Sequence, residues 1–217
     1  LSLVGSEMCI RDSYWSNSLR RAGYDGLVIK GVSSEPIYLF VDNQYALFRD
    51  ADSLWGKGTF ETEEAIRAEL GDPNVRVASI GVAGENLVRY ACVGNDRGRQ
   101  AGRTGLGAVW GSKNLKAVAV RGTQPVSVAN LGELNKLSLD LAERAQGVST
   151  AKYRVTGTVG NVLTLNRLGL LPTRNLRNSV FEAAEEVSGE FLQSHFREKT
   201  VACSGCPIAC EQVARVR

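Results

Sequence analysis

The sequence predicts an α+β protein whose β-rich first part is followed by an α-helical second part. Two observations support this division. Short runs of β-branched and aromatic residues alternate with turn residues up to about Gly122, whereas leucines at helical spacing follow Pro125. We therefore expect antiparallel sheets with a few helices over residues 14–125, and a helical domain that begins at residue 126.

The expected strands of the first part are short apolar runs bounded by turn residues. The first three lie close together in sequence and predict an antiparallel meander, and the fourth and fifth flank a Val-Ala-Gly-Glu-Asn turn. The six runs are Gly26–Gly31, Ile37–Val41, Tyr45–Arg49, Val75–Ile80, Leu87–Val93 and Ala117–Arg121.

One helix is expected between these strands and several after them. Thr62 resembles an N-cap, with two glutamates in the first turn and Gly71 at the end of the helix. Asn130 and Glu133 have the spacing of a capping box, and the leucines that follow continue the helix as far as Gly147. Residues 161–168 and 189–196 predict further helices, and the second part shows no strand-like alternation.

Composition and charge exclude several classes of function. The hydrophobic share is 43%, the charged share is 23% and the net charge is +3. The sequence contains no run of five like charges, which would suggest a nucleic-acid or membrane partner. No apolar run reaches the roughly 18–20 residues that span a bilayer. Closely spaced cysteines outside a secreted disulfide scaffold are typical of a reducing compartment, so we expect a soluble, cytoplasmic protein.

The first 13 residues, LSLVGSEMCIRDS, do not fit the rest of the chain. They show no helical or strand period, and they lack the basic region and long apolar run of a secretory signal. The string resembles a translated sequencing adaptor of the kind found at the ends of environmental assemblies. We therefore exclude residues 1–13 from the fold prediction.

A glycine- and arginine-rich segment, GNDRGRQAGRTGLGAVWGSKN over residues 94–114, is the first candidate site. Glycines let the backbone approach a bulky ligand, and exposed N–H groups together with arginines bind phosphate oxygens. The segment matches neither the dinucleotide-binding fingerprint nor the P-loop. Two interpretations therefore stay open, a phosphate-bearing cofactor or a glycine-rich helix packed tightly on a sheet.

The second candidate site is a Cys-x2-Cys-x3-Cys pattern formed by Cys203, Cys206 and Cys210. Thiolates at this spacing suit an iron–sulfur cluster, with zinc or unligated thiols as the alternatives. A four-iron cluster needs a fourth ligand, either Cys92 or a residue beyond this sequence. His195 could complete a zinc site, although an ordinary position on a helix surface suits it better.

These two segments together resemble the tungsten-dependent aldehyde:ferredoxin oxidoreductase family. Residues 75–122 are similar to the family signature almost throughout, and the cysteine pattern follows in the expected order. Shorter matches agree with it, at Ala22–Asp25, Leu54–Gly56, Gly157-Thr158, Asn166–Pro172 and Arg174-Asn175.

The resemblance implies a definite set of cofactors and residue roles. It implies a β-rich domain that supports a tungsten bis-pyranopterin with a bridging Mg²⁺, and a nearby [4Fe-4S] cluster. Arg99 matches a pterin-contacting arginine, and Gln100 would place its backbone carbonyl near the Mg²⁺. Gly98, Ala101 and Gly102 complete this candidate cofactor-binding set. The three clustered cysteines match metal ligands, and the resemblance makes Cys92 a strand residue instead of the fourth ligand.

The implied reaction is the oxidation of an aldehyde to a carboxylic acid, with electrons passed to ferredoxin. Further pterin-contacting segments are expected just before Tyr14, and the catalytic residues and fourth cysteine beyond Arg217. No catalytic residue is therefore assigned here, and the chain by itself is expected to be inactive, with homo-oligomers possible for the whole protein. The alternative is a stand-alone iron–sulfur electron-transfer or binding module.

Overall fold

The computed structural model describes residues 13–43 and 45–215. Twelve of the thirteen residues interpreted as adaptor-like therefore lie outside the described part. The chain divides into two compact units between Ser127 and Val128. No helix in the described part has the length and apolar character needed to cross a bilayer.

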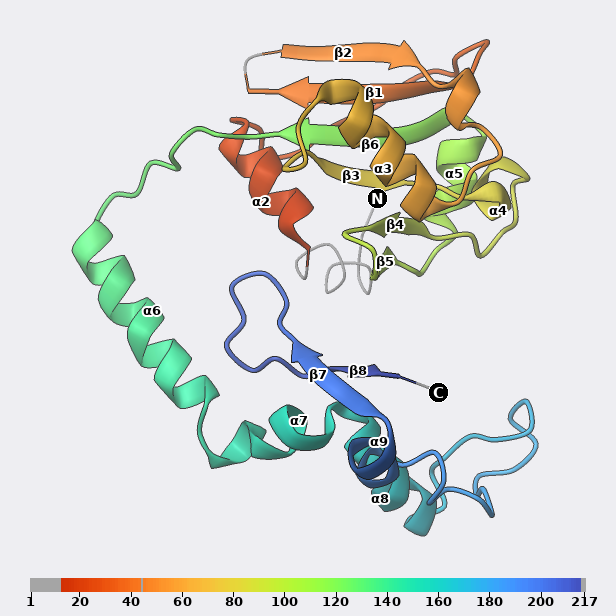
Figure 1. Cartoon of the computed structure of the whole chain (residues 1–217), viewed down its shortest axis with the longest axis vertical. Coiled ribbons are helices and arrows are strands. Elements are labelled where there is room, and N and C mark those ends of the chain that lie inside the picture. Colours follow the sequence, from red (N-terminus) through yellow and green to blue (C-terminus); the bar gives the residue numbers. More distant parts are fainter. Residues whose placement is uncertain (1–12, 44, 216–217) are drawn as a thin grey trace. The chain divides into compact units, whose positions relative to one another are not determined.

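The first unit is built on a six-stranded sheet with the order β2-β1-β6-β3-β4-β5 (Figure 1). The strands are β1 (Ile37–Asp42), β2 (Tyr45–Asp50), β3 (Arg76–Ser79), β4 (Val93–Asn95), β5 (Arg99–Ala101) and β6 (Leu115–Arg121). Its helices are α2 (Tyr14–Arg21), α3 (Thr59–Leu70), α4 (Val82–Glu85), α5 (Leu106–Gly111) and the 3₁₀ turn η1 (Asp52–Leu54).

Helices α2 and α3 cover opposite faces of this sheet. On one face, Ile66 of α3 packs with Tyr38 and Ala119, and on the other, Leu19 of α2 packs with Val41 and Val118. Strand β6 lies between β1 and β3, so six of its seven residues are buried. A strand covered on both faces reads as a continuous apolar run, and this explains the sequence Leu-Lys-Ala-Val-Ala-Val.

The α+β class is confirmed, but the purely antiparallel sheet was wrong. Strand β1 pairs with β6 in parallel, while the other ladders of the sheet are antiparallel. Because β6 occupies the position beside β1, the segment 26–31 has no strand to pair with, and the three-stranded meander does not form. Leu27 and Ile29 of that segment instead pack against the apolar cluster under α2.

Two further boundaries in the first unit differ from the prediction. Helix α3 begins at Thr59, one turn before Thr62, because Gly58 is the N-cap and its N–H donates to the Glu61 carboxylate over 3.0 Å. The expected strand 87–93 is absent, since Val82–Glu85 is helical, Leu87 has a φ of 58° and only Val93 enters a strand. The helix end at Gly71 is confirmed by its left-handed conformation.

The second unit is largely helical and contains α6 (Leu131–Ala145), α7 (Ala151–Thr156), α8 (Val162–Arg167) and α9 (Gly189–His195). The 3₁₀ turns η2 (Val148–Thr150) and η3 (Thr158–Asn161) connect the first three. The cap at Asn130 is confirmed, because its side chain accepts the Glu133 N–H over 3.0 Å. The Glu133 carboxylate accepts a hydrogen bond from the side-chain amide of Asn130. In a capping box it would accept from the backbone N–H of that residue, so the reciprocal bond differs here.

The expectation that this unit lacks strands was wrong. Strands β7 (Arg197–Val201) and β8 (Glu211–Ala214) form an antiparallel hairpin, and residues 202–210 connect them. The strands are short and largely polar, so they carry little of the alternation on which strand prediction depends. Figure 1 shows this hairpin at the end of the described chain.

Candidate functional site

The β4–β5 hairpin carries the predicted cofactor-binding residues of the first unit. Its turn closes through a hydrogen bond from the Gly98 N–H to the Asn95 carbonyl, 3.3 Å long. Asp96 and Arg97 at the centre of the turn have φ angles of 44° and 57°, the left-handed pair that suits a tight hairpin. Strand β5 is the last strand of the sheet, so half of its backbone N–H and C=O groups point away from β4.

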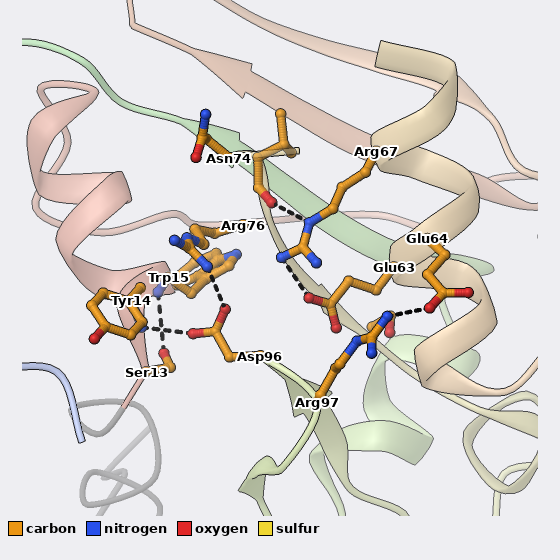
Figure 2. Close-up of polar contacts among 12 residues, drawn as sticks. Ser13, Tyr14, Trp15, Glu63, Glu64, Arg67, Asn74, Arg76, Asp96 and Arg97 are labelled. Carbon is orange, nitrogen blue, oxygen red and sulfur yellow. Dashed lines mark hydrogen bonds and ion pairs between the residues drawn. The ribbon is translucent and has the colours of Figure 1, made fainter. Parts of the chain in front are cut away.

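Ion pairs fix the turn to the rest of the unit (Figure 2). The Asp96 carboxylate accepts the Tyr14 N–H over 2.7 Å and pairs with Arg76 at 3.4 Å. The neighbouring Arg97 extends toward α3 and pairs with Glu64. The turn is therefore held from both helix-covered faces of the sheet.

Behind the turn, Glu63 of α3 is a buried carboxylate. It pairs with Arg67 at 2.6 Å, and Arg67 also donates from Nε to the Val75 carbonyl over 2.8 Å. Burial raises the pKa of Glu63 despite the opposing effect of Arg67. This group stabilises the join between α3 and β3 and lies behind the turn instead of on its exposed side.

The residues of the hairpin divide between the two faces of the sheet. Arg99 lies opposite Asn95, on the face covered by α2, because Asn95 pairs with Ala78 of the cluster that contacts Trp15. Gln100 lies opposite Gly94 on the other face. A Cβ at Gly94 would lie 3.2 Å from the Gln100 side chain, so this glycine makes room for it.

The glycines of this segment have two different structural roles. Gly105, Gly107 and Gly111 allow close backbone packing, since added Cβ atoms would lie 2.1 Å from the Arg89 oxygen, 2.6 Å from the Cys92 oxygen and 2.0 Å from the Gly84 oxygen. Gly98 and Gly102 are exposed, and the nearest atom to a Cβ on Gly102 is 3.7 Å away. The packed-helix interpretation thus holds for the second half of the segment, and the first half is open to a ligand.

Asn95 is buried at the base of the hairpin, with 7% of its surface exposed. Its Oδ1 atom has no hydrogen-bond partner in the described part of the chain. A buried amide oxygen left without a donor costs about 1–3 kcal/mol. The sequence did not single out Asn95 as a cofactor ligand, and its position beside Arg99 could be found only once the strand register was known.

A buried ion pair supports the packing around the glycines. Lys116 of β6 is fully buried and pairs with the almost fully buried Glu85 of α4. Lys116 Nζ also donates to the Lys57 carbonyl over 2.8 Å, and Glu85 accepts the Gly56 N–H over 2.9 Å. Burial lowers the pKa of Lys116, against the effect of Glu85. Sequence reasoning missed this pair, although a lysine inside an apolar strand was the available signal.

The loop of residues 202–210 carries Cys203, Cys206 and Cys210, each of intermediate burial and none in a disulfide. The Cys206 N–H donates to the Cys203 carbonyl over 3.0 Å and closes a turn in which Gly205 has a φ of 70°. A Cβ on Gly157 would lie 2.7 Å from the Cys210 oxygen, so the loop packs closely on the start of η3. The spacing and the shared loop fit a soft metal or a cluster.

The described part of the chain holds no group of three or more His, Cys, Asp or Glu side chains gathered tightly enough to bind a metal ion. His195 stacks on Phe191 with ring centroids 4.1 Å apart, and its Nδ1 lies 3.0 Å from the Phe191 carbonyl oxygen. His195 therefore makes these contacts with a residue of its own helix, α9. Cys92 lies just before β4 and not within a strand, with its Sγ 3.7 Å from the Cβ position of Gly102.

Family models match almost the whole chain. The description "Aldehyde ferredoxin oxidoreductase, N-terminal domain" matches residues 8–122, and "Aldehyde ferredoxin oxidoreductase, domains 2 & 3" matches residues 136–217. The chain belongs to the aldehyde ferredoxin oxidoreductase family. The first match contains the β4–β5 hairpin and the second contains the cysteine loop, so both candidate sites lie inside matched regions.

Similar proteins agree with the family assignment. A tungsten-containing aldehyde ferredoxin oxidoreductase of Pyrococcus abyssi (strain GE5 / Orsay) is 42% identical over 205 residues, which are 92% of this chain and 33% of that protein. The aliphatic sulfonate oxidoreductase, WOR-like subunit, of Pyrococcus furiosus is 31% identical over 212 residues, covering 92% of this chain and 34% of that one. The chain spans about a third of the length of these relatives.

A solved structure has a similar fold to this chain. It is the active site complex BamBC of benzoyl coenzyme A reductase in complex with 1,5 dienoyl-CoA. The TM-score is 0.73 at 33% identity, over 94% of this chain and 33% of the other.

Proposed function

We propose that this chain forms part of a tungsten enzyme that oxidises aldehydes to carboxylic acids. The observation that carries the proposal is the β4–β5 hairpin. Its edge strand, β5, places Arg99 between the exposed Gly98 and Gly102. The aldehyde class is favoured over other substrates of the family because the relatives named for aldehydes are 40–42% identical. The sulfonate oxidoreductase is 31% identical and the benzoyl-CoA reductase complex is 33% identical.

The residues of the hairpin fit a pterin with a phosphate group. The Arg99 guanidinium can donate two parallel hydrogen bonds to a phosphate or to pterin acceptors, and the exposed glycines let the ligand approach the backbone. Backbone carbonyls of β5 that face away from β4 can approach a Mg²⁺, as proposed for Gln100. Ala101 is buried and holds the end of the strand against the sheet.

When bound, a tungsten bis-pyranopterin supplies the oxygen-transfer and redox chemistry, converting an aldehyde and water to a carboxylic acid with release of two protons and two electrons. The chain's own contribution is to bind and orient. The Asp96 pairs fix the turn, and the Lys116–Glu85 pair fixes the helices next to it. No residue of the described part is assigned a proton-transfer role.

The cysteine loop supports a second part of the proposal. Cys203, Cys206 and Cys210 would hold a [4Fe-4S] cluster, with a fourth ligand from outside the loop, and such a cluster would supply one-electron transfer to a ferredoxin. Clustered thiols that are not in disulfides suit a reducing cytoplasm. A homo-oligomeric state of the whole protein is part of the same proposal.

The test uses the longest open reading frame that contains this sequence, expressed in cells supplied with tungstate. The purified protein is expected to contain tungsten, pterin, iron and acid-labile sulfide, and to reduce ferredoxin or a viologen dye when an aldehyde is added. Iron and sulfide without tungsten and pterin would instead support a stand-alone iron–sulfur module. Zinc in place of iron would contradict the cluster assignment.

A further inference from the structure

We infer that the side chain of Asn95 is an additional cofactor-positioning group, whose Oδ1 accepts a hydrogen bond from an N–H group of the pterin. The inference rests on the proposed function and extends it to a residue outside the predicted cofactor-binding set of residues 98–102. Asn95 is the last residue of β4, immediately before the turn that precedes Arg99.

Burial and hydrogen bonding make the first step of the argument. Asn95 is 7% exposed, and Oδ1 has no partner among residues 13–43 and 45–215. Buried polar atoms in folded proteins nearly always have a partner, because leaving one unpaired costs about 1–3 kcal/mol. A donor from outside the described part of the chain, such as a bound cofactor, would satisfy this oxygen.

Strand register makes the second step. Asn95 lies directly across from Arg99, so the two side chains share one face of the hairpin. On that face β3, β4 and β5 contribute the apolar Ala78, Val93 and Ala101. Asn95 is thus a polar group at the edge of an apolar cluster, next to the arginine proposed to contact the cofactor.

The chemistry of the two side chains is complementary. Arg99 offers only donors, which suit phosphate oxygens and pterin carbonyl or ring-nitrogen acceptors. The Asn95 oxygen is an acceptor, and a pterin carries N–H donors on its ring and its exocyclic amino group. Together the two side chains can bind both the hydrogen-bond acceptors and the N–H donors of a pterin, whereas an arginine alone can bind only the acceptors.

The test replaces Asn95 by leucine in the reading frame described above, and measures release of the pterin after dilution by the fluorescence of its oxidised form. Asn95→Leu is expected to speed release about tenfold, the effect of losing one hydrogen bond in a buried site. Apo-protein from cells starved of tungstate should unfold at the same or a higher temperature, because the variant removes an unpaired buried oxygen.

A matched control is Asp25→Asn, which breaks an exposed ion pair with Arg20 that has no part in fixing the hairpin, and it should leave the release rate unchanged. If the leucine variant does not fold, Asn95→Ala removes the oxygen without adding volume and should also speed release. Unchanged release in a folded variant, with pterin and tungsten present in the wild type, would overturn this inference alone. A wild type without pterin would overturn the proposed function and this inference together.

Discussion

The β4–β5 hairpin and the 202–210 loop carry the two groups of predicted cofactor ligands, but they are organised by different means. The hairpin belongs to a six-stranded sheet and is fixed by Asp96, Arg76 and Arg97. The cysteine loop belongs to a two-stranded sheet, and its thiols are not gathered into a metal-binding group in the described part.

The difference indicates which site depends on its cofactor for its shape. Buried packing and ion pairs determine the shape of the hairpin, so protein contacts alone define the proposed pterin platform. The loop of nine residues lies between two short strands outside the six-stranded sheet, and metal binding commonly supplies part of the folding free energy of such a site. We therefore expect the platform to tolerate loss of the cluster, and substitutions in its packing to unfold it.

The largest expected effect is complete loss of one cofactor. Cys206→Ser should abolish binding of iron and acid-labile sulfide, because a four-iron cluster needs its thiolate ligands. Tungsten and pterin should remain, since the hairpin lies in the other unit. Metal analysis of the purified protein measures both. Cys92→Ser is the control and should keep its iron; if it does not, Cys92 is the fourth ligand.

Breaking the buried ion pair should be the strongest single perturbation of the platform. Lys116→Met leaves Glu85 buried without its cation, and this should lower the free energy of unfolding by about 3–5 kcal/mol. Adding Glu85→Gln removes the unpaired charge and keeps an acceptor for the Gly56 N–H, so the double variant should recover most of the loss. Urea unfolding of the wild type, the two single variants and the double variant completes a double-mutant cycle. Additive effects of the two substitutions would contradict the pairing.

The two classes of glycine should respond differently to one added methyl group. In Gly111→Ala the Cβ would lie 2.0 Å from the Gly84 oxygen, so backbone must shift, at a cost of about 3 kcal/mol. Gly102→Ala meets only ordinary contacts and should change stability by no more than about 0.5 kcal/mol. Equal losses of stability in the two variants would remove the distinction between packing and open glycines.

The smallest effect concerns pH. Burial raises the pKa of Glu63 in the folded state, so between the ordinary value of 4.5 and the raised one the folded protein binds more protons than the unfolded chain. This group therefore favours folding at low pH, and its contribution falls as pH rises through that window. Glu63→Gln should gain stability relative to wild type as pH increases from 4.5 to neutrality. Denaturant midpoints across this range test the sign, and parallel curves would contradict it.

The sequence predicted the elements with strong local signals and missed those set by long-range pairing. The apolar run before Arg121 and the asparagine cap of α6 depend on neighbouring residues, and both were found. The segment 26–31 looks like a strand, but the position beside β1 is filled by β6, from almost 80 residues further along the chain. Local pattern could not reveal that competition.

The candidate sites follow the same division. The positions of Arg99 and Cys206 on a hairpin and a loop suit motifs that were read from residue type and spacing. The glycine-rich segment could not be divided by sequence into packing and open glycines, because the distinction depends on Arg89 and Gly84 lying against it. Asn95 and Lys116 gained significance only from burial and register.

The attachment of α2 has a consequence for synthesis on the ribosome. The Trp15 indole N–H donates to the Val118 carbonyl over 3.0 Å, a contact between residues 103 positions apart. At the usual 5–20 residues per second, the helix emerges about 5–20 s before its binding strand exists. During that interval its apolar face can contact early residues such as Val41 but lacks the β6 part of the cluster, so the nascent chain stays exposed to chaperones and to aggregation until β6 leaves the exit tunnel.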